Sequence, residues 1–434
     1  MRKAIGTIAR TLLLSWAAGA AASTHSWIGP SSGGLWSDAA NWSGGAPTGF
    51  EMGGTVVAFG SNVSSTQDIN ALVVDRIVFF GSGNVLHGSQ TLGLRGLLLT
   101  PAVQDLAGGN TLASDLTISF LNVGTSIDWT VSSGTMTVHA NLVGTAPKLT
   151  FTGNFALLGN NTYVGSTQVK SGLVTLNSNL ADEGIPASFL QIGDGIGAAG
   201  SAVVKNLSTE NIANDCYVEI YGDGKLDLGG FDETIAVLSD PGPSFGTVAL
   251  GAGTLTVAVP GYERGFSGVI SGTGGVTMAG TGIQRLHGVN TYTGATTVTN
   301  GTLAIEGTQT ASPITVKSGG KLTGLGTVGA ITVQSGGVLD PGLTLPSPNA
   351  GTLHAAVVSL APGAIFRVIL ENNSSPAPTG DLLITSGGIG LNGATLDVFV
   401  GYTPSPGDEF VVASNQNAAA WFSTWPLSGS VPST

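Results

Sequence analysis

LHGVNTYTGATTVTNGTL, residues 286–303, is the most informative stretch of the chain, because the chain contains it twice. The earlier copy, LLGNNTYVGSTQVKSGLVTL, occupies residues 157–176 at an offset of 129 residues. The residues that coincide are Leu157/Leu286, Gly159/Gly288, Asn161/Asn290, Thr162/Thr291, Tyr163/Tyr292, Gly165/Gly294, Thr167/Thr296, Val169/Val298 and Gly172/Gly301. Nine identities in sixteen positions indicate an internal repeat.

The second copy alternates apolar and polar residues on both sides of an Asn-Gly pair. We expect Thr296, Val298, Leu303 and Ile305 to point inward, and Thr297 and Thr299 to point outward. Asn300 and Gly301 tolerate positive φ and predict either a corner between two strands or the two-residue loop of a β-hairpin. We expect Tyr163 and Tyr292 to pack near such corners, and Asn161 and Asn290 to cap backbone amides there.

A second, shorter period in the sequence helps to decide between the corner and the hairpin. ITVKSGGKL (314–322) returns seventeen residues later as ITVQSGGVL (331–339), with another turn-strand-turn between them. Strands and glycine-rich corners that return at this spacing are typical of a parallel β-solenoid. Each coil leaves its apolar face and backbone edges open, and the next coil, about 4.8 Å further on, covers both. The spacing therefore favours the corner.

Composition agrees with an all-β chain. Only 9% of the 434 residues are charged and 68 are Gly, which disfavours long surface helices, while the apolar fraction of 42% is ample for a core. No stretch keeps a helical apolar period for more than two turns. Short strands are predicted at residues 55–59, 75–80, 92–99, 115–123, 135–143 and 254–259.

The chain divides by sequence into four parts. Residues 1–22 read as a signal peptide, with three basic residues, a short apolar run and a cut after Ala22. Residues 23–150 form an N-terminal solenoid section, and residues 151–345 form the repeat-bearing core. Residues 346–434 are β-rich and predict either a solenoid cap or a small sandwich. No segment of the mature chain is long and apolar enough for a membrane helix.

Five further stretches carry a resemblance to a known family. They are FSGVISGTGGVTMAGTG (266–282), GKLTGLGTVGAITVQSGGVLDPG (320–342), FLQIGDG (189–195), GKLDLGGFDETIAVLSD (224–240) and WSDAANWSGGAP (36–47). With the two copies of the repeat, they resemble the autotransporter-associated β-strand repeats of exported bacterial passenger proteins. The resemblance covers roughly residues 25 to 345, with a looser match as far as about residue 413.

The resemblance implies a right-handed parallel β-helix that is displayed at the cell surface or released from it. It implies a structural, adhesin-like role without cofactor or catalytic residues. Extracellular glycans or cell-surface components are the expected partners, and the manner of outer-membrane association is left open. We expect Trp27, Trp36 and Trp42 to be exposed and able to contact glycans.

Other classes of function are disfavoured by the residues themselves. Net charge falls from −12 to −15 when the basic signal segment is removed, so nucleic acid is not an expected partner. The five histidines are scattered, and Cys216 is the only cysteine. The acidic stretch 221–233 distantly resembles calcium-binding coils, but their repeat is not present. A polysaccharide lyase or glycosidase is the alternative, with Glu263 and Arg264, Asp232 and Glu233, or Glu371 as candidates.

Overall fold

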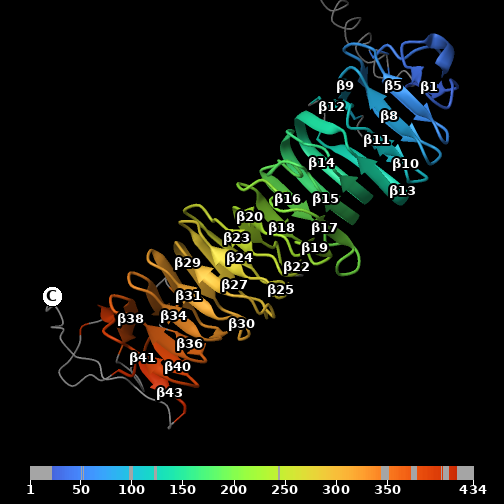
Figure 1. The fold of residues 1–434 in the computed structure, drawn as a ribbon. Helices are drawn as coiled ribbons and strands as arrows, with labels where there is room; N and C mark the ends of the chain where they lie inside the picture. Colours follow the sequence, from blue (N-terminus) through green and yellow to red (C-terminus); the bar gives the residue numbers. More distant parts are fainter. Residues whose placement is uncertain are drawn as a thin grey trace, which may run out of the picture. The chain divides into compact units, whose positions relative to one another are not determined.

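The computed structural model describes residues 22–49, 51, 53–96, 101–121, 125–242, 245–343, 351–372, 379–401, 403 and 410–417. The predicted signal peptide lies outside these residues apart from Ala22. Within the described ranges nearly all regular structure is β, and the one helix is the short 3-10 helix η1 (Ala39–Asn41). The chain forms two compact units, Met1–Val174 and Thr175–Thr434. Figure 1 shows the strands of each unit following one another as successive rungs.

The first unit stacks its strands in three parallel columns, one for each side of a coil. The first column contains β1 (Ser23–Trp27), β4 (Thr55–Phe59), β7 (Arg76–Phe79), β10 (Val103–Asp105) and the start of β13 (Ile127–Val138). The second contains β2 (Gly34–Leu35), β5 (Ser64–Gln67), β8 (Val85–Gly88), β11 (Thr111–Leu112) and the end of β13. The third contains β6 (Val73–Val74), β9 (Leu92–Leu94), β12 (Thr117–Phe120) and the start of β14 (Asn141–Leu157). The remaining elements are β3 (Trp42–Ser43) and β15 (Val164–Leu176).

The second unit repeats this arrangement over more coils. One column contains β20 (Glu233–Ile235), β23 (Leu255–Val257), β26 (Val276–Met278), β28 (Thr296–Val298), β31 (Ile314–Val316), β34 (Ile331–Val333), β37 (Val358–Leu360) and β41 (Ile389–Gly390). Another contains β24 (Glu263–Phe266), β27 (Ile283–Leu286), β29 (Gly301–Ile305), β32 (Gly320–Gly324), β35 (Val338–Pro341), β38 (Ile365–Asn372) and β42 (Thr395–Val400), with β39 (Thr379–Gly380) antiparallel to β38.

The second unit contains three further parallel stacks, which are shorter. They are β16 (Phe189–Ile192), β18 (Tyr217–Ile220) and β21 (Val237–Ser239); β17 (Ala202–Asn206), β19 (Gly224–Asp227), β22 (Thr247–Ala249) and β25 (Val269–Ser271); and β30 (Thr308–Gln309), β33 (Thr327–Val328), β36 (Thr352–Ala355), β40 (Leu382–Thr385) and β43 (Ala413–Asn415). Both units have the fold of a right-handed parallel β-helix, as the sequence predicted.

Parallel register explains how each core fills. In the first unit Val57 pairs with Ile77, Ile77 with Val103, and Val103 with Trp129, and all four side chains are fully buried. Equivalent positions of successive coils thus stack on one another inside the β-helix. Because strand side chains alternate between faces, their neighbours along each strand point to the opposite face, where Ala58 and Val78 are buried as well. The apolar residues that stack in register define the inner face of each coil.

The repeat forms a corner and not a hairpin. β28 and β29, on the two sides of Asn300 and Gly301, belong to different sheets, and each pairs in parallel with strands of neighbouring coils. Gly301 alone of the two takes a positive φ, of 64°. Downstream, Ile314 pairs with Ile331, which confirms the seventeen-residue return. The expected inward residues are buried: Thr296, Val298, Leu303 and Ile305.

The coils continue beyond residue 345. β36, β37 and β38 pair in parallel with strands of the preceding coil, and β40, β41 and β42 pair with them in turn. In its described residues this part therefore continues the parallel stacking of the solenoid. The section boundaries at 150 and 345 remain predictions. The division into compact units is a separate one and falls between Val174 and Thr175.

Candidate functional site

The centre of the second repeat copy, which the two copies share, is a buried polar corner. The side chain of Asn290 is buried, and its Oδ1 accepts a hydrogen bond of 2.9 Å from the backbone N–H of Ile270 in the preceding coil. Tyr292 is fully buried, with its hydroxyl 2.6 Å from Thr296 Oγ1. Thr296 Oγ1 lies 2.8 Å from Ser312 Oγ in the following coil. The corner therefore joins three coils through side-chain contacts.

The first copy has the same geometry in the other unit. Asn161 is buried, and its Oδ1 accepts a hydrogen bond of 3.0 Å from the backbone N–H of Leu142. Tyr163 is fully buried, and its hydroxyl lies 2.6 Å from Thr167 Oγ1. Burial also raises the pKa of the Tyr292 hydroxyl. Neither ring presents a face to solvent, so the motif tyrosines are contacts within the coil stack.

The motif glycines let neighbouring coils approach. Gly165 has a φ of 132°, and a Cβ there would lie 1.6 Å from the carbonyl oxygen of Ala146. At Gly294 a Cβ would lie 2.3 Å from the carbonyl oxygen of Gly274. Gly172, like Gly301, has a positive φ, of 87°. A side chain at these positions would therefore separate the coils or strain the corner.

Buried carboxamides and carboxylates make the same type of cap along the stack. In each pair a side-chain oxygen accepts from a backbone N–H one coil earlier: Asn84 from Val63, Asn110 from Asn84, Asn211 from Ser178, Glu233 from Asn211 and Asp381 from Gly351. These bonds satisfy amides that the turning backbone leaves outside the sheets. Sequence reasoning missed this series, because its only local signal is an Asn, Asp or Glu beside a strand.

The three N-terminal tryptophans require a correction. Trp27, Trp36 and Trp42 were expected on the surface, but their exposed fractions are 8%, 0% and 3%. β3 turns back to pair antiparallel with β1, and this return packs Trp42 edge-on against both Trp27 and Trp36. Phe59 closes the cluster. A glycan needs an accessible ring face, so the expectation of glycan contact at these residues is wrong.

The candidate carboxylates of the enzyme alternative do not form a catalytic pair. The carboxylate of Glu263 binds Arg285, while Arg264 donates to the backbone carbonyl of Glu263. The carboxylate of Asp232 accepts the backbone N–H of Thr254 at 2.7 Å, while Glu233 is fully buried in the capping series. Because it is buried, the pKa of Glu233 rises to about 8. Each of these groups is used to hold coils together.

Glu371, the last enzyme candidate, is half-buried near Asp381. Burial raises the pKa of Asp381 to about 7, with a smaller effect of neighbouring carboxylates that include Glu371. Both oxygens of Asp381 accept backbone amides, from Ile369 at 2.7 Å and from Gly351 at 3.0 Å. This carboxylate therefore caps the backbone.

No metal site emerges from the described residues. They contain no group of three or more His, Cys, Asp or Glu side chains suited to a metal ion. In the calcium-like stretch, Asp223 accepts the backbone N–H of Gly195, and Asp227 lies 3.2 Å from Lys225 Nζ. These acidic groups thus have separate structural partners.

The histidines and the cysteine are likewise separate. His25 lies 2.8 Å from Glu51, His87 lies 3.1 Å from Asp115, and His287 lies 3.5 Å from Glu306. Cys216 is fully buried, and its burial, with smaller effects of nearby carboxylates, raises the pKa of the thiol. A thiol with raised pKa in the core is a poor nucleophile.

One outward cluster was missed from the sequence. Phe189 and Tyr217 lie on adjacent strands in direct register, and their rings are stacked at 5.4 Å. Arg264 lies over the ring of Tyr217 and over that of Tyr262. The available signal was the shared alternation of FLQI and YVEI, whose inward residues are buried in both strands. The rings are far apart in sequence, which hides the cluster.

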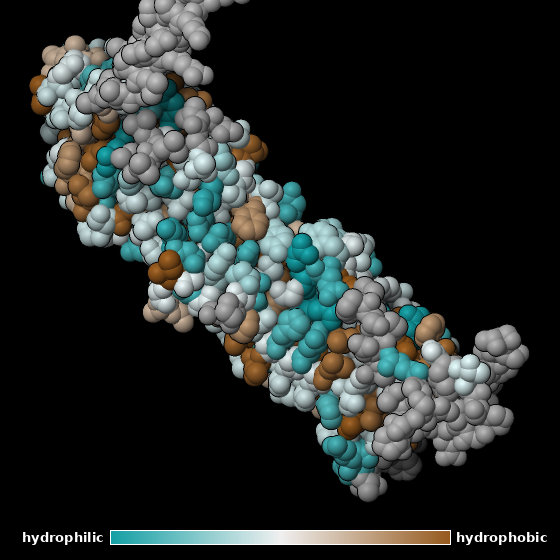
Figure 2. Space-filling model, turned by 180° about the vertical axis from the view of Figure 1, so that it is seen from behind, coloured by the Kyte–Doolittle hydropathy of each residue, from teal (hydrophilic) through white to brown (hydrophobic). Residues whose placement is uncertain are grey.

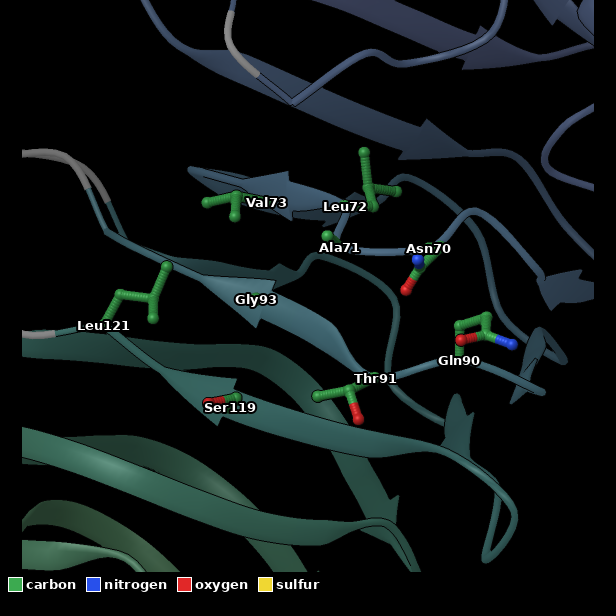
Figure 3. A pocket seen from close by; sticks show the side chains of 9 residues that line it. All are labelled: Asn70, Ala71, Leu72, Val73, Gln90, Thr91, Gly93, Ser119 and Leu121. Carbon is green, nitrogen blue, oxygen red and sulfur yellow. The ribbon is translucent and has the colours of Figure 1, made fainter.

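The first unit has a shallow hollow beside β6, β9 and β12, with a volume of about 270 Å³. Figure 3 shows it lined by aliphatic and small polar side chains, including Val73, Leu121, Gln90 and Thr91. No ionisable side chain is among its lining residues. The hollow offers apolar contact and hydrogen bonds but no acid or base.

Comparison with known proteins agrees with the geometry of the corners. The family model described as passenger-associated-transport-repeat matches residues 152–176 and 276–305, which contain the two Asn-x-Tyr corners. The adhesin BmaC autotransporter of Brucella suis is 32% identical over 199 residues, which is 45% of this chain and 5% of that protein. An extracellular serine protease of Serratia marcescens is 30% identical over 199 residues, 44% of this chain and 17% of that protein.

The fold and the corners define a parallel β-helical repeat protein. The two repeat matches and the similarity to an autotransporter adhesin confirm the resemblance to autotransporter passenger repeats that was drawn from the sequence. It spans only a small part of the length of these two relatives. No helix within the described residues has both the length and the apolar character needed to cross a membrane.

Proposed function

We propose that this chain acts as an exported, adhesin-like β-helical passenger, displayed at the bacterial cell surface or released from it, without catalysis. The observation that carries the proposal is the use of both repeat copies as structural corners. Asn161 and Asn290 each cap the coil before them, and Tyr163 and Tyr292 fill the core. The similarity to the adhesin BmaC autotransporter supports this role.

The few charged side chains also support a structural role, because they form ion pairs between coils. Arg285 on β27 binds Glu263 on β24, in the preceding coil, and Glu306, which directly follows β29 in the next coil. Lys321 lies 2.6 Å from the buried Asp340, and Arg367 lies 2.8 Å from Asp397 on the next strand. These ion pairs link successive coils along one face. In a solenoid, contacts between neighbouring coils add to the intrinsic stability of each coil.

An adhesion experiment tests this function. Beads coated with the full-length chain should adhere to cultured cells or to bacterial cells more than beads coated with albumin do, and antibody should label intact producing cells. The same protein should release no unsaturated products from acidic polysaccharides and no fragments from casein. Adhesion no greater than that of albumin beads, with no surface labelling, would contradict the proposed role. Turnover of either substrate would replace it with an enzymatic one.

A further inference from the structure

The second unit carries an aromatic strip on its outer surface. Phe189 on β16 pairs in register with Tyr217 on β18, and the two rings stack with centroids 5.4 Å apart and planes inclined by 27°. The next residues along the strands, Leu190 and Val218, are fully buried. Since strand side chains alternate, the two rings lie on the outer face. Two adjacent coils thus present neighbouring ring surfaces.

A guanidinium extends the strip along the solenoid. The centre of the Arg264 guanidinium lies 5.5 Å from the Tyr217 ring centroid and 4.7 Å from that of Tyr262. Its Nε donates to the Tyr217 hydroxyl at 3.2 Å. Arg264 is exposed, and Tyr262 is 42% exposed. We call Phe189, Tyr217, Arg264 and Tyr262 the aromatic strip.

Polar side chains lie beside the aromatic strip. Gln191 and Glu219 are the next outward residues of the same two strands, and they are also in register. Gln191 Nε2 donates to the carbonyl of Gly193 at 2.9 Å, which orients its amide. Burial, and to a smaller extent Asp240, raises the pKa of Glu219. Amide and carboxyl groups next to ring faces can bind hydroxyl groups at the edge of a ligand that stacks on the rings.

We propose that the aromatic strip binds a neutral polysaccharide. A sugar ring presents a flat face of C–H groups with hydroxyls around its edge, which matches ring faces flanked by Gln191 and Glu219. Glu219 on the same strand as Tyr217 lies close to Asp240, the carboxylate of Glu263 is paired with Arg285, and the chain carries a net charge of −12. This balance opposes a polyanion. The proposal rests on the adhesin-like function and names its ligand class.

A protein partner fits the aromatic strip less well. A stable protein interface covers about 800 Å² on each partner and has an apolar centre. The strip has only three rings, in polar surroundings. Figure 2 shows one face of the molecule, on which hydrophobic residues occur as separate groups among polar ones. Weak contacts with a polymer suit so small a surface, because many copies displayed together add avidity.

Binding of the full-length chain to soluble polysaccharides tests the proposal. The probes are a mannan, a galactan and a neutral β-glucan, with alginate as the polyanion. We expect the parent chain to bind at least one neutral probe, and Tyr217→Ala or Phe189→Ala to weaken that binding about three- to ten-fold. Phe399→Ala removes another exposed ring, on β42, and should bind as the parent does. Unfolding midpoints, measured on the same samples, should be unchanged because the replaced rings lie outside the core.

Several results would overturn the proposal: no neutral probe binds, alginate alone binds, or Tyr217→Ala and Phe399→Ala behave alike. The bead assay separates this failure from failure of the proposed function. If coated beads adhere equally well with the parent chain and with Tyr217→Ala, the adhesin-like role stands and the aromatic strip is not its binding site. If beads coated with the parent chain fail to adhere and antibody does not label producing cells, the proposed function itself fails.

Discussion

Replacing Asn290 by alanine removes the side-chain oxygen that accepts the backbone N–H of Ile270 at 2.9 Å. Both residues are buried, so water cannot readily take the place of the lost acceptor. A buried donor left without a partner costs about 1–3 kcal/mol. Because Ile270 belongs to the preceding coil, we expect the loss to weaken the contact between two coils and not the local corner alone. In a solenoid such damage is felt mainly by nearest neighbours.

Amide hydrogen exchange read by mass spectrometry measures this effect locally. A cost of 1–3 kcal/mol corresponds to exchange of the Ile270 amide that is about 5- to 150-fold faster when exchange follows local opening. The matched control is Asn300→Ala, which alters an exposed asparagine of the same repeat and should leave the Ile270 amide unchanged. Equal protection of the Ile270 amide in the parent chain and in Asn290→Ala would refute the cap between coils.

Further predictions concern packing, pH and the tryptophans. Gly165→Ala places a Cβ against the carbonyl of Ala146 at a φ of 132°, and should lower the free energy of unfolding in urea by about 3 kcal/mol or more. The control Gly60→Ala, whose Cβ meets open space, should change this free energy by less than about 0.5 kcal/mol. Equal effects of the two substitutions would count against a close approach of the coils at Gly165. Burial raises the pKa of Glu233 from 4.5 to about 8, so its contribution to stability is complete below the lower value and is lost as pH rises through the higher one. Urea titrations across this range should show that the free energy of unfolding changes less with pH in Glu233→Gln than in the parent chain, the difference being at most about 5 kcal/mol. Identical pH profiles of the two proteins would contradict the raised pKa. Trp36→Ala should cost about 3–5 kcal/mol in the same titration without changing adhesion of the folded chain; unchanged stability with lost adhesion would restore a surface role.

The corners were predictable because their signals are local. Alternation on both sides of Gly301 marks two inner faces, and a glycine with positive φ between them marks the bend. The return of Ile314 at Ile331 then fixes the coil length and rejects the hairpin. Each of these observations uses residues close together in sequence. The all-β class and the parallel β-helix follow from them.

The surface was less predictable because it depends on contacts between distant residues. Trp42 is buried because β3 folds back on β1, and composition does not reveal that return. Asn290 was recognised as a cap, but its partner Ile270 lies twenty residues earlier, at a distance set by the variable coil length. The pair of Phe189 and Tyr217 was missed for the same reason.

Cross-linking of engineered cysteines tests parallel stacking most directly. Thr297 pairs with Thr315 of the next coil in parallel register, both half-buried on the outside, and neighbouring strands lie about 4.8 Å apart, within the reach of a disulfide. In a Cys216→Ala background, oxidation should link Thr297→Cys to Thr315→Cys. It should not link Thr297→Cys to Ala304→Cys, the partner expected in a hairpin that turns at Asn300 and Gly301. Mass spectrometry of the oxidised peptides distinguishes the two results, and a bond in the second pair but not the first would contradict the parallel β-helix.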